Sequence, residues 1–373
     1  MPQKLHIISF DIPCSPLYGG IIDVYYKIVA LHNEGVEIIL HCFEYGNSKS
    51  INEIKPYCNQ FYSYPRKSFL SSVFSSLPHI VVSRSNDELL INLLKDENPI
   101  LMEGIHSTFF LSHPALQKRK IIVWNHNIEY DYYSMLAKAS KNIAYKLYYW
   151  LESIKLKNYQ SNLKYADCII GVSQKDAITL LENFKQTVYI PAFNQQKDVK
   201  SLTGKGDYVI YHGNLSVEEN EIAILWLIEK VWSKLNYHVI IAGKNPTQRI
   251  IDAIKPYSQI TLKSNISQNE MNELQINAQI HCLITFQDTG IKHKLLNALY
   301  IGRYVITNNK MVNGTGLESL VILANTPSEL ISKIHLLMMN SFDEINIQER
   351  KTILDHDFNN QVNAKKLMKL IYN

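Results

Sequence analysis

The alternation of short apolar runs with helical patterns constrains the fold of this chain more than any other feature. Leu5–Phe10 is an apolar run of strand length. The next segment places apolar residues at helical spacing and ends at Gly35, and Glu37–Phe43 is a second apolar run. A buried strand, a helix and a second buried strand in this order are typical of a parallel α/β unit. Further apolar runs continue the pattern at residues 99–104, 120–126, 168–173 and 188–193.

The alternation stops at the polar stretch NQQKDVKSLTGKGD, residues 194–207, and then restarts. Such a stretch is typical of a linker, and 373 residues suffice for two domains. We therefore predict an α/β fold of two tandem, doubly wound, Rossmann-like domains. The predicted N-terminal domain is 1–195, the linker 196–206 and the C-terminal domain 207–355. Ligands of such sheets bind at the carboxyl ends of the strands, so we expect a site in a cleft that the two domains face.

Composition limits the classes of function. A formal net charge of +4 is too small to indicate a nucleic-acid partner. The five cysteines are too widely spaced for a metal-binding knuckle, which favours reduced thiols in a cytoplasmic protein. The first residues, MPQKLHIISFDIP, do not form a signal peptide, and no apolar run reaches the length of a membrane span. We expect a cytoplasmic protein that is soluble or lies on a membrane surface.

A glycine turn after the first apolar run bears on the choice of ligand. Gly19 and Gly20 open a helix, where backbone N–H groups can approach a phosphate or a reacting sugar. A tight turn that merely needs glycine is an equally good interpretation. The turn lacks the GxGxxG pattern of dinucleotide-binding proteins, which disfavours a nicotinamide-dependent dehydrogenase.

Two histidines follow later apolar runs, each with a glutamate nearby. His106 lies close to Glu103, and His126 lies close to Glu129. A lone histidine is more often structural, but two at strand ends beside carboxylates favour a polar cleft. Neither an HExxH pattern nor a Cys/His knuckle surrounds them, so we predict no metal site.

The segment TFQDTGIKHKLLNALYIGRYVITNN, residues 285–309, runs from a strand into a basic helix and then into another strand. Lys292 and Lys294 lie in the first turns of this helix, where positive charge opposes the helix macrodipole. An anion bound near Gly290 would use both the dipole and the lysines. The alternative is a solvated basic face. Lys244 lies at the end of another predicted strand, in IIAGKNP.

The same segment resembles the nucleotide-sugar motif of family 4 glycosyltransferases, a Gly-x-x-x-Lys-x-Leu-Glu-Ala-Leu-x-x-Gly-x-Pro-Val run. Other stretches resemble further motifs of the family in the same order: HNIE at 126–129, YADCIIGVS at 165–173, GNLSVEEN at 213–220, AGKNP at 242–246 and GTGLE at 314–318. The resemblance covers nearly the whole chain. It implies the GT-B fold, with an acceptor half, a donor half and a C-terminal helix, about 356–373, that crosses back to the first domain.

The resemblance implies a retaining, metal-independent glycosyltransferase without a cofactor. It would move a hexose from a UDP- or GDP-linked donor to a bacterial surface glycan or a lipid-linked acceptor. His106 corresponds to the catalytic histidine near the reacting sugar. The donor-binding positions that we predict are Gly19, Gly20, His126, Glu129, Asn214, Lys244, Gly290, Ile291, Lys292, Lys294 and Asn297.

Several positions depart from the family pattern. Asn297 stands where a glutamate usually grips the ribose, and Thr289 occupies the first place of the same Glu-x7-Glu pair. An amide still forms a hydrogen bond to a hydroxyl, but a weaker one than a carboxylate. Asn214 and Asn220 stand where Arg and Lys are frequent, and Lys244 is the candidate to supply the missing charge. The alternative function is therefore a non-catalytic nucleotide-sugar-binding module that partners another transferase.

Two segments combine basic and aromatic residues in a way that suits a membrane surface. Residues 63–78 place Arg66 and Lys67 beside Phe69, and residues 138–166 form a lysine-rich aromatic helix. We favour peripheral membrane contact for the first segment. For the second we favour an ordinary amphipathic helix packed on the sheet, with its lysines in solvent. Attachment to the inner face of the cytoplasmic membrane would suit a lipid-linked acceptor.

Overall fold

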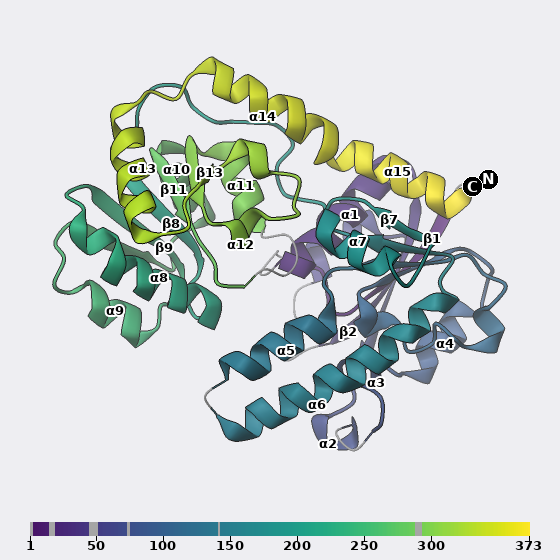
Figure 1. Ribbon diagram of the computed structural model, residues 1–373. Coiled ribbons are helices and arrows are strands. Elements are labelled where there is room, and N and C mark those ends of the chain that lie inside the picture. The colour runs from purple at the N-terminus through teal and green to yellow at the C-terminus, as the bar shows by residue number, and fades with distance from the viewer. Residues whose placement is uncertain (1–2, 15–18, 45–50, 73–74, 141, 288–292) are drawn as a thin grey trace. The chain divides into compact units, whose positions relative to one another are not determined.

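The computed structural model describes residues 3–14, 19–44, 51–72, 75–140, 142–287 and 293–373 (Figure 1). The chain divides into two compact units. The first combines Met1–Gln195 with the C-terminal segment Asp357–Asn373, and the second combines Gln196–Asp288 with Lys292–His356. Each unit contains one parallel sheet with connecting helices, which confirms the predicted α/β class with two doubly wound domains.

The sheet of the first unit has seven strands, all parallel. Its five central strands are buried along most of their length, which explains why the sequence shows continuous apolar runs there. The two edge strands are only partly buried, and the one at Gln60–Pro65 is not an apolar run and was not predicted. In spatial order the strands are β3 (Gln60–Pro65), β2 (Glu37–Glu44), β1 (Lys4–Ser9), β4 (Ile100–Glu103), β5 (Ile121–Asn125), β6 (Cys168–Gly171) and β7 (Thr187–Tyr189).

Helices of the first unit form where apolar residues recur at helical spacing. α1 buries Ile21, Val24, Ile28 and Leu31 against the sheet core. Side-chain caps fix several helix starts; the side-chain oxygen of Asn142, for example, accepts from the backbone N–H groups of Ala144 and Tyr145 in α6. The helices are α1 (Gly19–Asn33), α2 (Phe69–Ser72), α3 (His79–Val82), α4 (Asp87–Leu93), α5 (Glu129–Ala139), α6 (Ile143–Tyr159), α7 (Gln174–Leu181) and α15 (Asn360–Tyr372).

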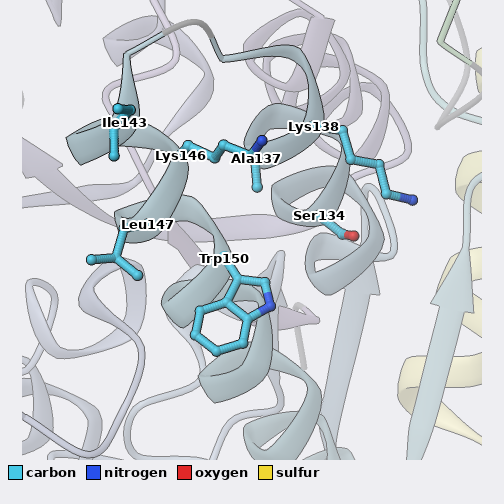
Figure 2. A pocket seen from close by; sticks show the side chains of 7 residues that line it. All are labelled: Ser134, Ala137, Lys138, Ile143, Lys146, Leu147 and Trp150. Carbon is cyan, nitrogen blue, oxygen red and sulfur yellow. The ribbon is translucent and has the colours of Figure 1, made fainter.

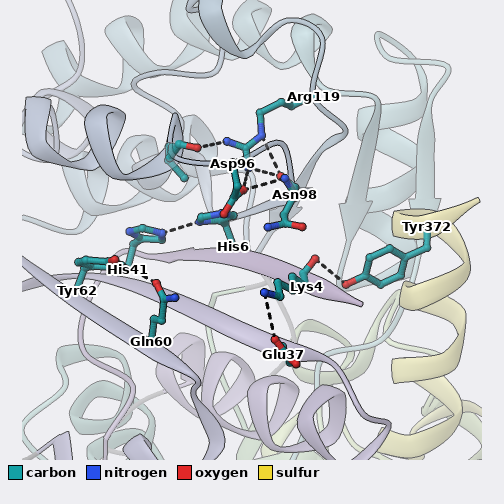
Figure 3. A network of polar contacts seen from close by, with 11 residues as sticks. Lys4, His6, Glu37, His41, Gln60, Tyr62, Asp96, Asn98, Arg119 and Tyr372 are labelled. Carbon is teal, nitrogen blue, oxygen red and sulfur yellow. Dashed lines mark hydrogen bonds and ion pairs between the residues drawn. The ribbon is translucent and has the colours of Figure 1, made fainter. Parts of the chain in front are cut away.

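The C-terminal helix α15 belongs to the first unit, as predicted. Ala364, Leu367 and Ile371 join the same apolar core as α1. The hydroxyl of Tyr372 donates to the backbone oxygen of Lys4 at 3.0 Å, which ties the end of the chain to its first strand (Figure 3). A helix far away in sequence thus completes the core of the N-terminal half.

The second unit contains a six-stranded parallel sheet. In spatial order its strands are β10 (Ile260–Ser264), β9 (His238–Lys244), β8 (Tyr208–Asn214), β11 (Ile280–Leu283), β12 (Tyr304–Thr307) and β13 (Ile322–Leu323). Its helices are α8 (Glu218–Lys230), α9 (Gln248–Ile254), α10 (Gln268–Asn277), α11 (His293–Ile301), α12 (Asn309–Val312), α13 (Pro327–Met339) and α14 (Glu344–Asp357, ending in the first unit).

Both sheets have a point at which the strand order reverses. In the first sheet the chain adds β2 on one side of β1 and β4 on the other, and in the second it adds β9 and β11 on opposite sides of β8. The loops at the carboxyl ends of these central strands diverge to opposite faces of the sheet. Such a switch point is where open α/β sheets bind ligands.

A polar network of the first unit lies at the opposite, amino end of the sheet (Figure 3). His6 pairs in register with Ile100, the first residue of β4. Its ring nitrogens lie 2.8 Å from His41 and 2.9 Å from a carboxylate oxygen of Asp96. Burial lowers the pKa of both histidines, so they are neutral and complete a hydrogen-bonded chain. We assign this network to structure.

Candidate active site

The candidate site of the first unit is built on the carboxyl ends of β1, β4 and β5, three neighbouring strands. Phe10 directly follows β1, and its ring packs against His106 and His126, with centroids 5.2 and 5.4 Å apart. A Cβ atom on Gly20 would lie 2.9 Å from the Phe10 ring. Glycine at position 20 therefore lets α1 approach this ring, and Gly19, the first residue of α1, precedes it.

A closed network of buried charges lies beneath these rings. The Nζ atom of Lys27 lies 2.8 Å from both carboxylate oxygens of Glu103 and 3.6 Å from Oδ2 of Asp23. The indole N–H of Trp124 donates to the same Asp23 oxygen at 2.6 Å, and the Lys27 ammonium lies 3.6 Å from the Trp124 ring centre. All four side chains are buried. The carboxylates are thus compensated inside the protein.

His126 is the fifth member of this network. Its Nε2 atom lies 2.9 Å from Oε2 of Glu103, and its Nδ1 atom lies 3.3 Å from Oδ2 of Asp23. Both ring nitrogens therefore face carboxylates, which fixes the orientation of the ring. His126 is thus held in place by two carboxylates of the protein. Direct contact between His126 and the nucleotide-sugar donor stays a prediction.

The carboxylates and His126 bear on metal binding. One ligand atom each from Asp23, Glu103 and His126 lies within 4.8 Å of the others, close enough to surround a cation. The Lys27 ammonium already contacts both carboxylates, so a metal ion would have to displace it. The arrangement fits an internal ammonium, and we propose no metal here.

His106 lies on a 3₁₀ turn, Ile105–Ser107, that follows β4 through Gly104 in the left-handed region at φ 66°. Burial, with the nearby charges of Arg84, His126 and Arg66, lowers the pKa of His106 well below 6.5. The imidazole is therefore neutral near pH 7. Within the described part of the chain, its buried Nδ1 atom has no hydrogen-bond partner. The residue as a whole is partly exposed, so a ligand hydroxyl can approach the exposed edge of the ring.

Glu129 is the first residue of α5 and is buried. Burial raises the pKa of its carboxyl from 4.5 to about 7, against a weak opposing hydrogen bond that Asn127 donates at 3.5 Å. A carboxyl that titrates near neutrality can take up or release a proton at physiological pH. Glu129 is therefore a candidate for proton transfer or for a protonated hydrogen-bond donor.

The candidate site of the second unit is organised around Lys294. Its Nζ atom donates to the Tyr211 hydroxyl at 3.0 Å and to the Asn220 side-chain oxygen at 2.6 Å. Tyr211 lies in β8, Asn220 in the first turns of α8, and Lys294 near the start of α11. The amide nitrogen of Asn220 also donates to the backbone oxygen of Asn214 at 2.9 Å. These bonds fix the lysine at the carboxyl end of β8.

The ends of neighbouring strands are tied to the same region. Asn214 and Lys244 pair in register as the last residues of β8 and β9. Thr285, just after β11, exchanges two hydrogen bonds with Asn308, at 3.2 and 2.7 Å, and its hydroxyl bonds to Glu219. The fold thus gathers Asn214, Lys244 and Lys294 at the switch point of the second sheet.

Asn297 is held by a different set of contacts. Its amide nitrogen donates to Gln275 at 2.7 Å, and its amide oxygen accepts from Gln196 at 2.7 Å. The side chain of Asn297, which we predict to bind ribose, is thus already bonded to two glutamines. A ribose hydroxyl could bond to it only if a glutamine moved away, or through the second lone pair of the amide oxygen. The predicted contacts Gly290, Ile291 and Lys292 lie outside the described residues.

Several residues of both sites were missed in the sequence. Asp23 and Lys27 carried a usable signal, because they form a charged pair at i and i+4 on a helix whose neighbouring residues are apolar. Phe10 and Tyr211 read as ordinary buried positions of strands, so nothing in their local pattern distinguished them.

We compared the sequence and the fold of the chain with those of known proteins. Residues 206–340 match the family model described as Glycosyl transferases group 1. No curated protein sequence is significantly similar to the chain.

Three solved structures illustrate the likeness of the fold. HepE of Anabaena, in complex with UDP and glucose, shares 9% sequence identity and a TM-score of 0.68, over 98% of each chain. TarM of S. aureus, in complex with UDP, α-GlcNAc-glycerol and fondaparinux, shares 10% identity and a TM-score of 0.69, over 100% of each chain. A glycosyltransferase from Rickettsia africae shares 15% identity and a TM-score of 0.65, over 99% of this chain and 98% of the other.

Proposed function

We propose that the chain is a retaining, metal-independent hexosyltransferase, because residues 206–340 match the family model Glycosyl transferases group 1 and the fold is similar to that of HepE and TarM. The donor is a UDP- or GDP-linked sugar, and the acceptor is a bacterial surface glycan or a lipid-linked saccharide. The match over residues 206–340 carries this proposal. HepE and TarM were both solved with UDP, which favours UDP as the base of the donor.

We assign the donor diphosphate to the residues around Lys294. As the sugar leaves, negative charge grows on the diphosphate, and a fixed ammonium stabilises that charge without reorganisation. Tyr211 and Asn220 supply the fixation through bonds of 3.0 and 2.6 Å. Lys244 and Asn214 contribute from the adjacent strand ends. Lys292 and the backbone of Gly290 and Ile291, outside the described residues, complete this assignment.

We assign the reacting sugar to His106. The neutral imidazole forms a hydrogen bond with a sugar hydroxyl and so orients the ring of the sugar. The acceptor hydroxyl oxygen bonds to the anomeric carbon, the bond from that carbon to the diphosphate breaks, and the acceptor proton ends on the departing phosphate. Phe10, packed on the rings of His106 and His126, positions His106 for this contact.

One observation favours a second function. Asn297 replaces the usual glutamate, and its amide is bonded to Gln275 and Gln196. A weakened ribose contact would suit a module that binds a nucleotide sugar without transferring it and that partners an active transferase.

Thermal unfolding with a panel of ligands tests the binding part of the proposal. UDP, GDP, dTDP, ADP and NAD would be compared at one millimolar-range concentration. A ligand at about 100 times its Kd adds about 2.7 kcal/mol to the stability, which raises Tm by a few degrees. We expect a shift with a single nucleoside diphosphate. A shift with NAD alone, or none with any diphosphate, would contradict the proposal.

Replacement of His106 separates a transferase from a binding module. We expect His106→Ala to lower the turnover of the identified donor by about a hundredfold with the donor Kd unchanged, because an oriented hydrogen bond is lost. His32→Ala, on the exposed end of α1, is the matched control. Full turnover in His106→Ala would make the histidine structural, and no turnover in the wild-type protein would favour the binding module.

A further inference from the structure

The apolar side chains in the first half of α6 are exposed to solvent. Ile143, Tyr145, Leu147, Trp150 and Leu151 are 84, 60, 54, 52 and 45% exposed. Tyr149 packs on Tyr133 of α5, and full burial begins only further along, at Glu152, Ser153, Leu156 and Tyr159. We predicted one amphipathic helix over residues 138–166 that packs on the sheet. In the structure α5 ends at Ala139, α6 spans Ile143–Tyr159, and the first turns of α6 are exposed. Large apolar side chains that gather in one exposed patch mark an interaction surface.

The patch borders a hollow of about 500 Å³ between α5 and α6 (Figure 2). Ala137 of α5 and Ile143, Leu147 and Trp150 of α6 give it an apolar lining, and Lys138 and Lys146 lie at the same place. Trp and Tyr beside lysines are the residues that settle at the boundary between lipid headgroups and acyl chains.

The charge around the patch is strongly positive. Between residues 138 and 157 the sequence has five lysines and one acidic residue, Glu152. That glutamate is buried and bonds to the backbone N–H of His79 at 2.7 Å and to Lys155 at 3.0 Å. Around the patch on α6 the lysines therefore outnumber the acidic side chains, although Asp131 on α5 is also exposed, and this excess of positive charge complements an anionic partner.

A neighbouring segment extends the patch. Phe69, in α2, is 47% exposed, and its ring lies 5.5 Å from that of Tyr148 on α6. Arg66 and Lys67 precede it in the sequence. The two segments that the sequence singled out for a membrane surface thus meet in the folded unit and form one surface.

We propose that this α5–α6 surface docks the protein on an anionic lipid membrane. The apolar residues of α6 enter the boundary between headgroups and acyl chains, and Lys138 and Lys146 contact lipid phosphates. A second copy of the chain is a poorer occupant, because it would bring two lysine-rich surfaces together. In the part of the chain that the structure describes, no helix is long and apolar enough to cross a bilayer. Attachment through this surface would therefore be peripheral.

Flotation of the full-length chain with lipid vesicles tests the proposal. The two vesicle types are pure phosphatidylcholine and phosphatidylcholine with phosphatidylglycerol. We expect binding to the second type that weakens as salt rises. Leu147→Glu with Trp150→Glu lowers the apparent affinity at least about tenfold, whereas Ile178→Glu, on the exposed face of α7, leaves it unchanged. Lys138→Ala and Lys146→Ala each lower it about fivefold.

Three outcomes would overturn the proposal. They are no binding to anionic vesicles, undiminished binding of the Leu147→Glu/Trp150→Glu variant, and a dimer in sedimentation velocity that this variant dissociates. Cooperative thermal unfolding of each variant without ligand shows whether the variant is folded, and the lysine variants provide the test if the double variant is not. Vesicle binding requires no turnover, so the two proposals fail independently.

Discussion

The polar clusters at the switch points of the two sheets occupy equivalent places in the topology but are built differently. In the first unit, the charges of Asp23, Lys27 and Glu103 are fully buried and compensate one another. In the second, the partly buried Lys294 is held by the hydroxyl and amide groups of Tyr211 and Asn220. A closed ion network serves stability and orientation, whereas a partly buried, hydrogen-bonded ammonium is suited to an incoming anion.

The largest effect is expected from opening the closed network. Lys27→Met leaves the carboxylates of Asp23 and Glu103 buried without their cation, which costs about 3–5 kcal/mol of the free energy of unfolding. Urea unfolding measures this loss. Lys4→Met is the control, because Lys4 forms an exposed pair with Glu37 and its removal costs less than about 1 kcal/mol. Equal losses of the free energy of unfolding in Lys27→Met and Lys4→Met would contradict the view that the buried network contributes more to stability than the surface pair.

The next effect concerns pH and Glu129. Its pKa is about 7 in the folded chain and about 4.5 in the unfolded chain, so the folded state binds more protons between these values. This contribution to stability is complete below about pH 4.5 and is lost as pH rises through about 7, by roughly 3 kcal/mol in total. Glu129→Gln abolishes it. The difference in free energy of unfolding between the wild-type protein and Glu129→Gln should therefore change progressively from pH 4.5 to 8. A difference that stays constant with pH would contradict the raised pKa.

The second cluster is tested through affinity. Lys294→Ala should weaken binding of the nucleoside diphosphate by about 1.5–3 kcal/mol, roughly 10- to 150-fold in Kd, because a charge-assisted contact is lost. Isothermal titration measures Kd. Lys230→Ala, on the exposed end of α8, is the control. An unchanged Kd in Lys294→Ala would mean that this lysine, like Lys27, serves the fold alone.

The smallest effect is expected from replacing Tyr211, whose hydroxyl accepts a hydrogen bond from Lys294. Tyr211→Phe removes one hydrogen bond to Lys294 and one to Asn220, so the ammonium is less well fixed. We expect the Kd of the diphosphate to rise about two- to tenfold, which corresponds to about 0.5–1.5 kcal/mol. Tyr237→Phe, whose hydroxyl lies 3.1 Å from His335 at the surface, is the matched control. A rise as large in this control would exclude a specific role for Tyr211.

Much of the fold followed from patterns along the chain. Apolar runs separated by helices predicted two parallel sheets, and the polar stretch after residue 193 predicted the interruption between them. Residues after parallel strands share one edge of the sheet, so the sequence could predict that His106 and His126 lie close together, and both rings pack against Phe10. Glu103 was noticed only as a neighbour, since its partner Lys27 lies 76 positions earlier in the sequence.

The sequence pattern could not predict which turns of α6 are exposed. Apolar residues at helical spacing look the same whether the helix packs on a sheet or projects from it. Glu152 and Leu156 are buried, whereas Leu147 and Trp150 on the same helix are exposed, and Trp150 lies only two residues before Glu152. What covers each turn of a helix depends on chain segments that are distant in sequence.

The sequence by itself determined the two-sheet architecture, most of the strands and helices and the candidate residues at strand ends, because these depend on local periodicity and on topology rules. It did not determine the edge strand Gln60–Pro65, which is not an apolar run. The tertiary structure decided which charges are compensated, which ring is neutral and which helix face is left open. Those properties depend on burial and on distances of a few ångströms between residues far apart in the chain. Desolvation and Coulomb energies change steeply over such distances, and no local pattern records them.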